Sequence, residues 1–210
     1  MTTPPAGPTR DASHWDRRYA QRELVWTAEP NRFVREATKD LPPGSALDLG
    51  AGEGRNAVWL AARGWAVTAV DFSAVGLGKG RELAAHHGVE VTWVTADLGH
   101  WTPPAGAFDL VLVAYLQVEA DLLAKVLAEA AAALAPGGRL VAVGHDRDNL
   151  EHGHGGPPDP AVLYTVAGVT APRGDLEIDR AEVAERPVEL EDGGVATALD
   201  TFVIARRPAG

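Results

Sequence analysis

The chain has 210 residues, of which 46% are hydrophobic and 23% charged, a composition typical of one globular domain with a full-sized core. Its formal net charge of −10 argues against nucleic acid as the main partner, because affinity for phosphates requires a basic stripe. The absence of cysteine excludes disulfides, thiolate zinc ligands and thiol nucleophiles. No secretory leader and no bilayer-length apolar run is evident, so we expect a cytoplasmic protein without a membrane partner.

The N-terminal part of the chain predicts a short tail and a helical segment. Residues 1–10 are rich in Pro, Thr and Gly and are expected to be disordered, ahead of a single domain over 11–210. Residues 11–40 mix polar and aromatic side chains and predict a helical lid, with helix starts near Asp11 or Ser13 and at Asn31.

Between residues 46 and 143, short apolar runs alternate with segments of helical composition. The expected strands are 46–49, 66–70, 89–95, 108–113 and 139–143. The expected helices are 56–63, 74–87 and 121–134, the second weakened by three glycines. Strands that are apolar on both faces and alternate with helices predict a parallel sheet covered by helices on both sides.

The C-terminal part follows a different pattern. A polar loop over 145–160 and a short helix over 161–169 precede two β-rich stretches, 176–190 and 195–206. The segment 191–194, Glu-Asp-Gly-Gly, supplies the positive φ angles that a hairpin turn favours. The prediction is therefore an α/β fold, Rossmann-like and doubly wound, whose mostly parallel seven-stranded sheet ends in an antiparallel C-terminal hairpin.

A glycine-rich turn, Asp48-Leu-Gly-Ala-Gly-Glu-Gly, ends the first strand and opens a helix. Glycine lets the backbone approach a ligand closely, and the start of the helix presents free N–H groups. Asp71 closes the second strand, where its carboxylate can accept hydrogen bonds from ribose hydroxyls. These features predict an adenosine-type site at the carboxyl ends of the strands.

The same glycines fit a dinucleotide-binding pattern loosely, so an NAD-dependent oxidoreductase is the alternative enzyme class. Asp48 would face the pyrophosphate of NAD unfavourably, yet it suits the ammonium group of a methionine moiety. The C-terminal hairpin would also reverse the last strand, whereas dinucleotide folds continue in parallel. Both points favour a methionine-containing cofactor.

Over nearly its whole length the chain resembles the class I S-adenosylmethionine-dependent methyltransferases. The matching blocks are 47–56, 67–73, 95–98, 108–113 and 134–140. The opening Trp15-Asp-Arg-Arg-Tyr19 and the Gly-Arg-Asn at 54–56 are similar to the small bacterial tellurite-resistance and thiopurine-type enzymes. The resemblance implies S-adenosyl-L-methionine as cofactor and in-line methyl transfer to a small-molecule acceptor, with a thiol or chalcogen nucleophile as one option.

The resemblance also implies roles for single residues. Asp48 would lie near the ammonium group, Asp71 at the ribose and Phe72 beside the adenine, while Asp97 would accept from the adenine amino group. Trp26 has a core position, and Asn56 a local capping role, as alternative interpretations. The cofactor-binding residues expected in this way are Trp26, Asp48, Gly50, Ala51, Gly52, Asn56, Asp71, Phe72, Ser73, Asp97, Leu98 and Ala114.

Tyr115 and His145 follow the fourth and fifth strands and are the candidate catalytic residues, expected to contact the acceptor. A general base is needed only if the nucleophile arrives protonated. The 145–154 segment contains metal-binding residue types, but loop histidines are usually solvated, so no metal is predicted. A non-catalytic cofactor-binding module remains a further alternative, and the sequence leaves a homodimer open.

Overall fold

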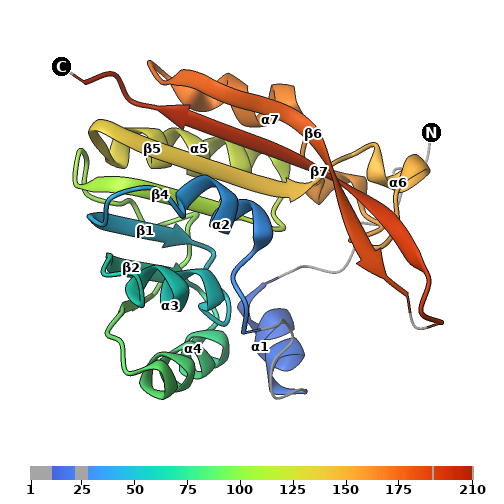
Figure 1. The fold of residues 1–210 in the computed structure, drawn as a ribbon, viewed down its shortest axis with the longest axis horizontal. Coiled ribbons are helices and arrows are strands. Elements are labelled where there is room, and N and C mark those ends of the chain that lie inside the picture. The colour runs from blue at the N-terminus through green and yellow to red at the C-terminus, as the bar shows by residue number, and fades with distance from the viewer. Residues whose placement is uncertain (1–10, 22–27, 191, 210) are drawn as a thin grey trace.

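The computed structural model describes residues 11–21, 28–190 and 192–209 (Figure 1). Within them the strands form one seven-stranded sheet in the order β3-β2-β1-β4-β5-β7-β6. Pairing is parallel from β3 to β5, and β7 runs antiparallel to both β5 and β6. The predicted fold class is confirmed. The strands are β1 (Ser45–Leu49), β2 (Ala66–Asp71), β3 (Thr92–Thr95), β4 (Phe108–Ala114), β5 (Leu134–His145), β6 (Glu177–Glu189) and β7 (Val195–Arg206).

Helices cover both faces of the sheet, and several of them begin where a polar side chain accepts a hydrogen bond from the first N–H groups. Asp11, Asn31 and Ser73 accept these hydrogen bonds at α1, α2 and α4. The helices are α1 (Ala12–Ala20), α2 (Arg32–Thr38), α3 (Arg55–Ala61), α4 (Ala74–His87), α5 (Ala120–Ala133), α6 (Asn149–His152) and α7 (Val166–Thr170). Two single 3₁₀ turns, at Pro160–Val162 and Ala171–Arg173, flank α7.

The strand side chains alternate between two hydrophobic clusters. Leu47 and Val111 belong to the cluster that α5 closes on one face of the sheet. Ala46 and Leu110, each one residue earlier, belong to the cluster under α2 and α3 on the other face. Burial on both faces explains why these strands read as continuous apolar runs in the sequence.

The helix α4 forms despite its three glycines because packing requires two of them. A Cβ on Gly80 would lie 2.6 Å from the Trp93 ring, and one on Gly76 would lie 3.0 Å from the Tyr19 ring. The missing side chains therefore let α4 approach β3 and α1 closely. Here tertiary contact outweighs helix propensity, which is a weak local preference.

Two strands begin three or more residues away from the predicted position, and the helix expected over 161–169 is instead a 3₁₀ turn at Pro160–Val162 followed by α7 at Val166–Thr170. The third strand begins at Thr92 instead of residue 89, and β5 begins at Leu134 instead of residue 139. Leu134 pairs with Phe108, and the ladder then shifts register before Arg139. The Pro-Gly-Gly stretch at 136–138 thus lies inside an irregular strand beyond the end of α5. Glycine is needed at 138 because a Cβ there would lie 2.9 Å from the Phe108 carbonyl oxygen.

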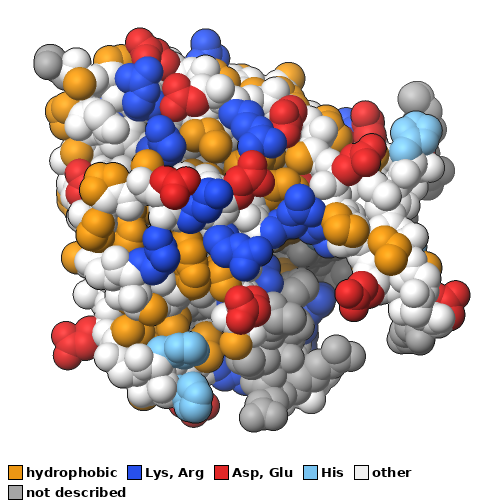
Figure 2. Space-filling model, viewed as in Figure 1, with side chains coloured by type: hydrophobic (Ala, Val, Ile, Leu, Met, Phe, Trp, Pro, Cys, Tyr) orange, Lys and Arg blue, Asp and Glu red, His pale blue; other side chains and the backbone are white. Residues whose placement is uncertain are grey.

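The exterior carries mixed charge. Figure 2 shows Lys and Arg side chains over α2, where Arg32, Arg35, Lys39 and Arg63 border a shallow hollow beside Trp59. Acidic side chains lie among them, and Arg180 pairs with Glu36 at 2.6 Å. Among the residues described, no helix has the length and apolar character needed to cross a membrane.

Candidate active site

A cleft of about 310 Å³ opens where β1, β2, β4 and β5 end, next to the glycine turn. The turn, Asp71 and the residues after β4 and β5 all contribute to its wall. The sequence-predicted residues that line it are Gly50, Ala51, Gly52, Asn56, Asp71, Phe72, Ala114, Tyr115 and His145. The topology therefore brings most of the predicted site residues to one place, as parallel strands with a common carboxyl edge require.

Asp71 organises the glycine turn as well as facing the cleft. Its two carboxylate oxygens accept hydrogen bonds from the Gly52 and Ser73 backbone N–H groups, both at 2.8 Å. Burial raises the pKa of Asp71 above its usual value, and these N–H donors oppose the rise. Gly52 has φ +56°, a conformation that costs residues with a Cβ roughly 1–2 kcal/mol.

Asp48 lies behind the turn and does not line the cleft. Its side chain is 1% exposed, and neither carboxylate oxygen makes a hydrogen bond of standard geometry with a described residue, although the nearby Ala57 backbone N–H partly offsets the effect of burial on its pKa. Burial, reinforced by the charge of Asp71 and opposed by Arg55, raises the pKa of Asp48 to about 7. A buried carboxylate without a well-formed hydrogen bond beneath a glycine turn is suited to a cationic group bound above it, such as the ammonium group of a methionine moiety.

The helix α1 lies against the glycine turn, and Trp15 and Tyr19 line the cleft beneath it. Ser73 Oγ donates to Asp16 at 2.5 Å, which ties α1 to the start of α4. Lys79 Nζ donates to the Tyr19 carbonyl oxygen at 2.5 Å. Trp15 and Tyr19 are buried, at 8% and 5% exposed, and they also border the cleft. The predicted contact of Trp26 lies outside the described residues.

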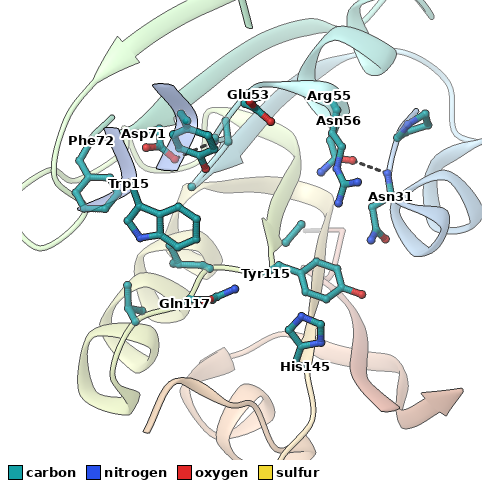
Figure 3. Close-up of a pocket in the computed structure, with 18 of the residues that line it drawn as sticks. Trp15, Asn31, Glu53, Arg55, Asn56, Asp71, Phe72, Tyr115, Gln117 and His145 are labelled. Carbon is teal, nitrogen blue, oxygen red and sulfur yellow. Dashed lines mark hydrogen bonds between the residues drawn. The ribbon is translucent and has the colours of Figure 1, made fainter. Parts of the chain in front are cut away.

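Asn56 links α3 to the beginning of α2. Its side-chain oxygen accepts a hydrogen bond from the Asn31 backbone N–H at 2.9 Å (Figure 3). The side chain of Asn31 in turn accepts from the Phe33 and Val34 N–H groups. The side-chain oxygen of Asn56 therefore has the local structural role that the sequence left open, at the wall of the cleft.

Three further predicted residues do not line the cleft. Ser73 caps α4 and bonds Asp16. The Asp97 side chain is 57% exposed and binds the Gly99 N–H, a hydrogen bond that lowers the pKa of Asp97. Leu98 is buried in the cluster that α5 closes. Their cofactor contacts remain predictions.

Tyr115 and His145 lie side by side at the opposite end of the cleft from Asp71, with ring centroids 4.8 Å apart (Figure 3). Tyr115 has φ +55°, which is strained for a residue with a side chain, and its hydroxyl is buried without a hydrogen bond. Burial raises the pKa of Tyr115 far above its ordinary value. Strain of this kind tends to be kept at functional sites.

The sequence interpretation missed two charged residues near this pair, Arg186 and Asp200. Arg186 on β6 and Arg55 on α3 line the cleft, and Asp200 on β7 lies completely buried beside His145. Arg186 Nε donates to Asp200 Oδ2 at 2.7 Å. A charged residue within the apolar run of β7 was the available signal, since a buried carboxylate requires a partner.

Comparison with known proteins finds similarity to methyltransferases. Residues 46–138 match the family described as "Methyltransferase domain". The fold is the methyltransferase fold. An N-methyltransferase, NodS from Bradyrhizobium japonicum WM9, solved in complex with S-adenosyl-L-homocysteine, superimposes with a TM-score of 0.69 at 18% identity, covering 94% of this chain and 98% of that one. The family match and the fold indicate S-adenosylmethionine as the cofactor, in agreement with the sequence prediction.

Two curated relatives match about half of the chain. The ribosomal RNA small subunit methyltransferase C of Alcanivorax borkumensis is 35% identical over 103 residues, covering 47% of this chain and 31% of the relative. The demethylmenaquinone methyltransferase of Thermus thermophilus is 39% identical over 101 residues, covering 47% of this chain and 46% of the relative. The chain therefore spans less than half the length of either relative.

Proposed function

We propose that this chain is an S-adenosylmethionine-dependent methyltransferase that transfers a methyl group in line to a small-molecule acceptor. The observation that carries the proposal is the buried, unpartnered Asp48 beneath the glycine turn at the end of β1. A carboxylate in that position is costly unless a cation is bound nearby, and the methionine moiety of this cofactor supplies an ammonium group.

The cofactor fits the residues present. The Gly50–Gly52 backbone would hold the methionine portion, Asp71 the ribose and Phe72 the adenine, all of which border the cleft. When bound, the cofactor supplies an electrophilic methyl group on a sulfonium. The residues of the chain then have to orient the acceptor, exclude water and take up any proton that is released.

The acceptor end of the cleft lies between Tyr115, His145 and Arg186. A cavity of about 310 Å³ fits a small molecule. The net charge of −10 does not favour an RNA acceptor such as the one named for the Alcanivorax relative. The similarity of residues 15–19 and 54–56 to the tellurite-resistance and thiopurine-type enzymes supports a thiol or chalcogen nucleophile within the same proposal.

The two alternatives predict different ligands. An NAD-dependent enzyme would place a pyrophosphate against Asp48 and Asp71, two buried side chains whose carboxylates would repel it. A non-catalytic module would bind the cofactor without consuming it. Only the lack of turnover therefore distinguishes such a module from an enzyme.

Isothermal titration calorimetry with S-adenosylhomocysteine and with NADH tests the cofactor. We expect S-adenosylhomocysteine to bind and NADH not to bind. Asp71→Asn should weaken binding at least tenfold, about 1.4 kcal/mol, whereas Asp40→Asn, at a side chain 88% exposed, should leave it unchanged. Binding of NADH in preference to S-adenosylhomocysteine would refute the proposal.

A coupled assay of S-adenosylhomocysteine release then tests turnover across thiols, phenols, amines, halides and chalcogen oxyanions. Release with at least one class supports an enzyme. Binding without release in any class supports the non-catalytic module.

A further inference from the structure

Resting on the proposed function, we propose that His145 is a general base held by Asp200, and that the acceptor is a neutral molecule carrying an S–H or O–H group. His145 would touch the acceptor, and Asp200 would act through His145 as a positioning residue. This pairing excludes, as the physiological acceptors, nucleophiles that arrive already as anions, such as halides and chalcogen oxyanions.

The fold places the two side chains together from distant parts of the chain. His145 is the last residue of β5, and the antiparallel register sets it directly opposite Asp200 of β7. Their Nδ1 and Oδ1 atoms are 3.3 Å apart, and both atoms are buried. Neither atom makes a hydrogen bond that meets standard geometry with another described residue, and the Tyr115 hydroxyl also lies near enough to interact with Asp200.

The second carboxylate oxygen of Asp200 binds an arginine, which favours the ionised form of the side chain. Its side chain is 0% exposed, and Oδ2 accepts from Arg186 Nε at 2.7 Å. Burial raises the pKa of Asp200, but His145 and Arg186 together outweigh that effect and keep it below the usual value. A buried carboxylate of this kind favours a proton on the facing imidazole nitrogen and stabilises the imidazolium that a base becomes.

The ring of His145 is also fixed in orientation. A Cβ on Gly156 would lie 3.1 Å from both Cγ and Nδ1, so the 153–156 loop packs on the Nδ1 edge of the ring. The Tyr115 ring packs against the imidazole at an interplanar angle of 64°. Nδ1 is the ring nitrogen within ion-pair distance of Asp200, although the contact does not have hydrogen-bond geometry here, so the nitrogen that remains for the cleft is Nε2.

The groups that face His145 are few. Asp200 comes from β7, Arg186 from β6 through Asp200, and Tyr115 from the end of β4. Burial keeps the hydroxyl of Tyr115 protonated. Asn149 and the glycines of the neighbouring loop are uncharged. Asp200 is therefore the only carboxylate that the described residues place within ion-pair distance of the imidazole.

The proton balance follows from this arrangement. The acceptor's S–H or O–H proton passes to His145 Nε2 while its sulfur or oxygen forms the new bond to the methyl carbon. The bond between that carbon and the sulfonium breaks, and its electron pair leaves with the sulfur as a neutral thioether. The imidazolium, stabilised by Asp200, then releases its proton to solvent. An acceptor that is already an anion would have no use for the base.

Nuclear magnetic resonance of ¹⁵N-histidine-labelled protein bound to S-adenosylhomocysteine tests the positioning role without turnover. At pH 8 we expect His145 to carry its proton on Nδ1 and to have a bare Nε2. Asp200→Asn should shift the population toward the Nε2-protonated form. Asp179→Asn, which removes another β6/β7 ion-pair carboxylate away from the cleft, should change nothing. A wild-type protein with the proton on Nε2 would overturn the proposal.

The release assay tests the base with two acceptors that stay neutral near pH 7, 2-mercaptoethanol and phenol, and with two anions, iodide and selenite. We expect turnover with the thiol or the phenol, and a loss of at least 100-fold in His145→Gln with S-adenosylhomocysteine affinity retained. Imidazole added to His145→Gly should restore part of the rate. Turnover restricted to iodide or selenite and unchanged in His145→Gln would overturn the inference while leaving the proposed function standing. Failure to bind S-adenosylhomocysteine would remove the proposed function itself. If no probe is methylated, the tautomer measurement decides the role of Asp200.

Discussion

Asp48 gives the sharpest prediction. Burying its charge lowers the free energy of unfolding of the unliganded protein, and a bound cation beside the carboxylate should remove this penalty and so strengthen binding. Its carboxylate is buried without hydrogen bonds, and its pKa is raised from 3.8 to about 7. At 1.36 kcal/mol for each pH unit, that difference amounts to about 4 kcal/mol of stability lost once Asp48 ionises in the folded state.

The sign follows from proton counting. Between pH 3.8 and about 7 the folded state holds a proton on Asp48 that the unfolded state has released, so rising pH favours unfolding. The contribution is fully present below pH 3.8 and is lost by about pH 7. Asp48→Asn removes this dependence, although the buried amide itself costs about 1–3 kcal/mol. We therefore expect the free energy of unfolding of the variant to be no higher than that of the wild type at pH 4. At pH 8 it should be about 2 kcal/mol higher than that of the wild type.

Urea unfolding from pH 4 to pH 8 measures the difference, and calorimetry with S-adenosylhomocysteine measures its counterpart. Binding of the ammonium group should favour the charged Asp48, so wild-type affinity should rise with pH up to about 7 and then level off. Affinity in Asp48→Asn should be weaker and flat over that range. A stability difference between the two proteins that does not change with pH would refute the reasoning, because the carboxylate would then not be paying a desolvation cost.

Three further substitutions test the turn, the lid and the core. Gly52→Ala should weaken S-adenosylhomocysteine binding at least tenfold, because φ is +56° and the new Cβ would lie 2.7 Å from the Tyr19 hydroxyl. The control is Gly88→Ala, where φ is +64° and the space around the new Cβ is open. This variant should lose roughly 1 kcal/mol of stability and bind normally in the same titration. Lys79→Ala removes the hydrogen bond to the Tyr19 carbonyl oxygen and should speed ligand dissociation severalfold in stopped-flow fluorescence, and an unchanged rate would show that α1 needs no such tie. Phe202→Ala empties a fully buried site in β7 and should cost about 3–5 kcal/mol in urea unfolding, where a loss under 1 kcal/mol would contradict the packing described.

The cofactor half of the site was predictable because its residues are local in the sequence. The turn between β1 and α3 and the carboxylate at the end of β2 lie within about twenty-five residues, and parallel strands must bring their carboxyl ends to one edge. The contacts expected of Asp97 and Leu98 depend on how a short loop packs, which no local pattern specifies. The structure has the side chain of Asp97 exposed and that of Leu98 in the core.

The turn at 48–56 was thus recognisable from residue types alone, but the state of Asp48 was not. Its pairing with an ammonium group was inferred from charge, whereas its burial, its lack of well-formed hydrogen bonds and its raised pKa depend on what packs around it.

The sequence by itself determined the alternation of strands and helices, the hairpin and the adenosine-type turn, since each is encoded over a few consecutive residues. Only the tertiary structure decided the acceptor end of the cleft. His145 and Asp200 are 55 residues apart and meet because β7 returns antiparallel to β5 in one particular register. Arg186 joins them from β6 through the same hairpin. Shifting that register by one residue would turn Asp200 to the other face of the sheet, so the pairing depends on non-local strand geometry.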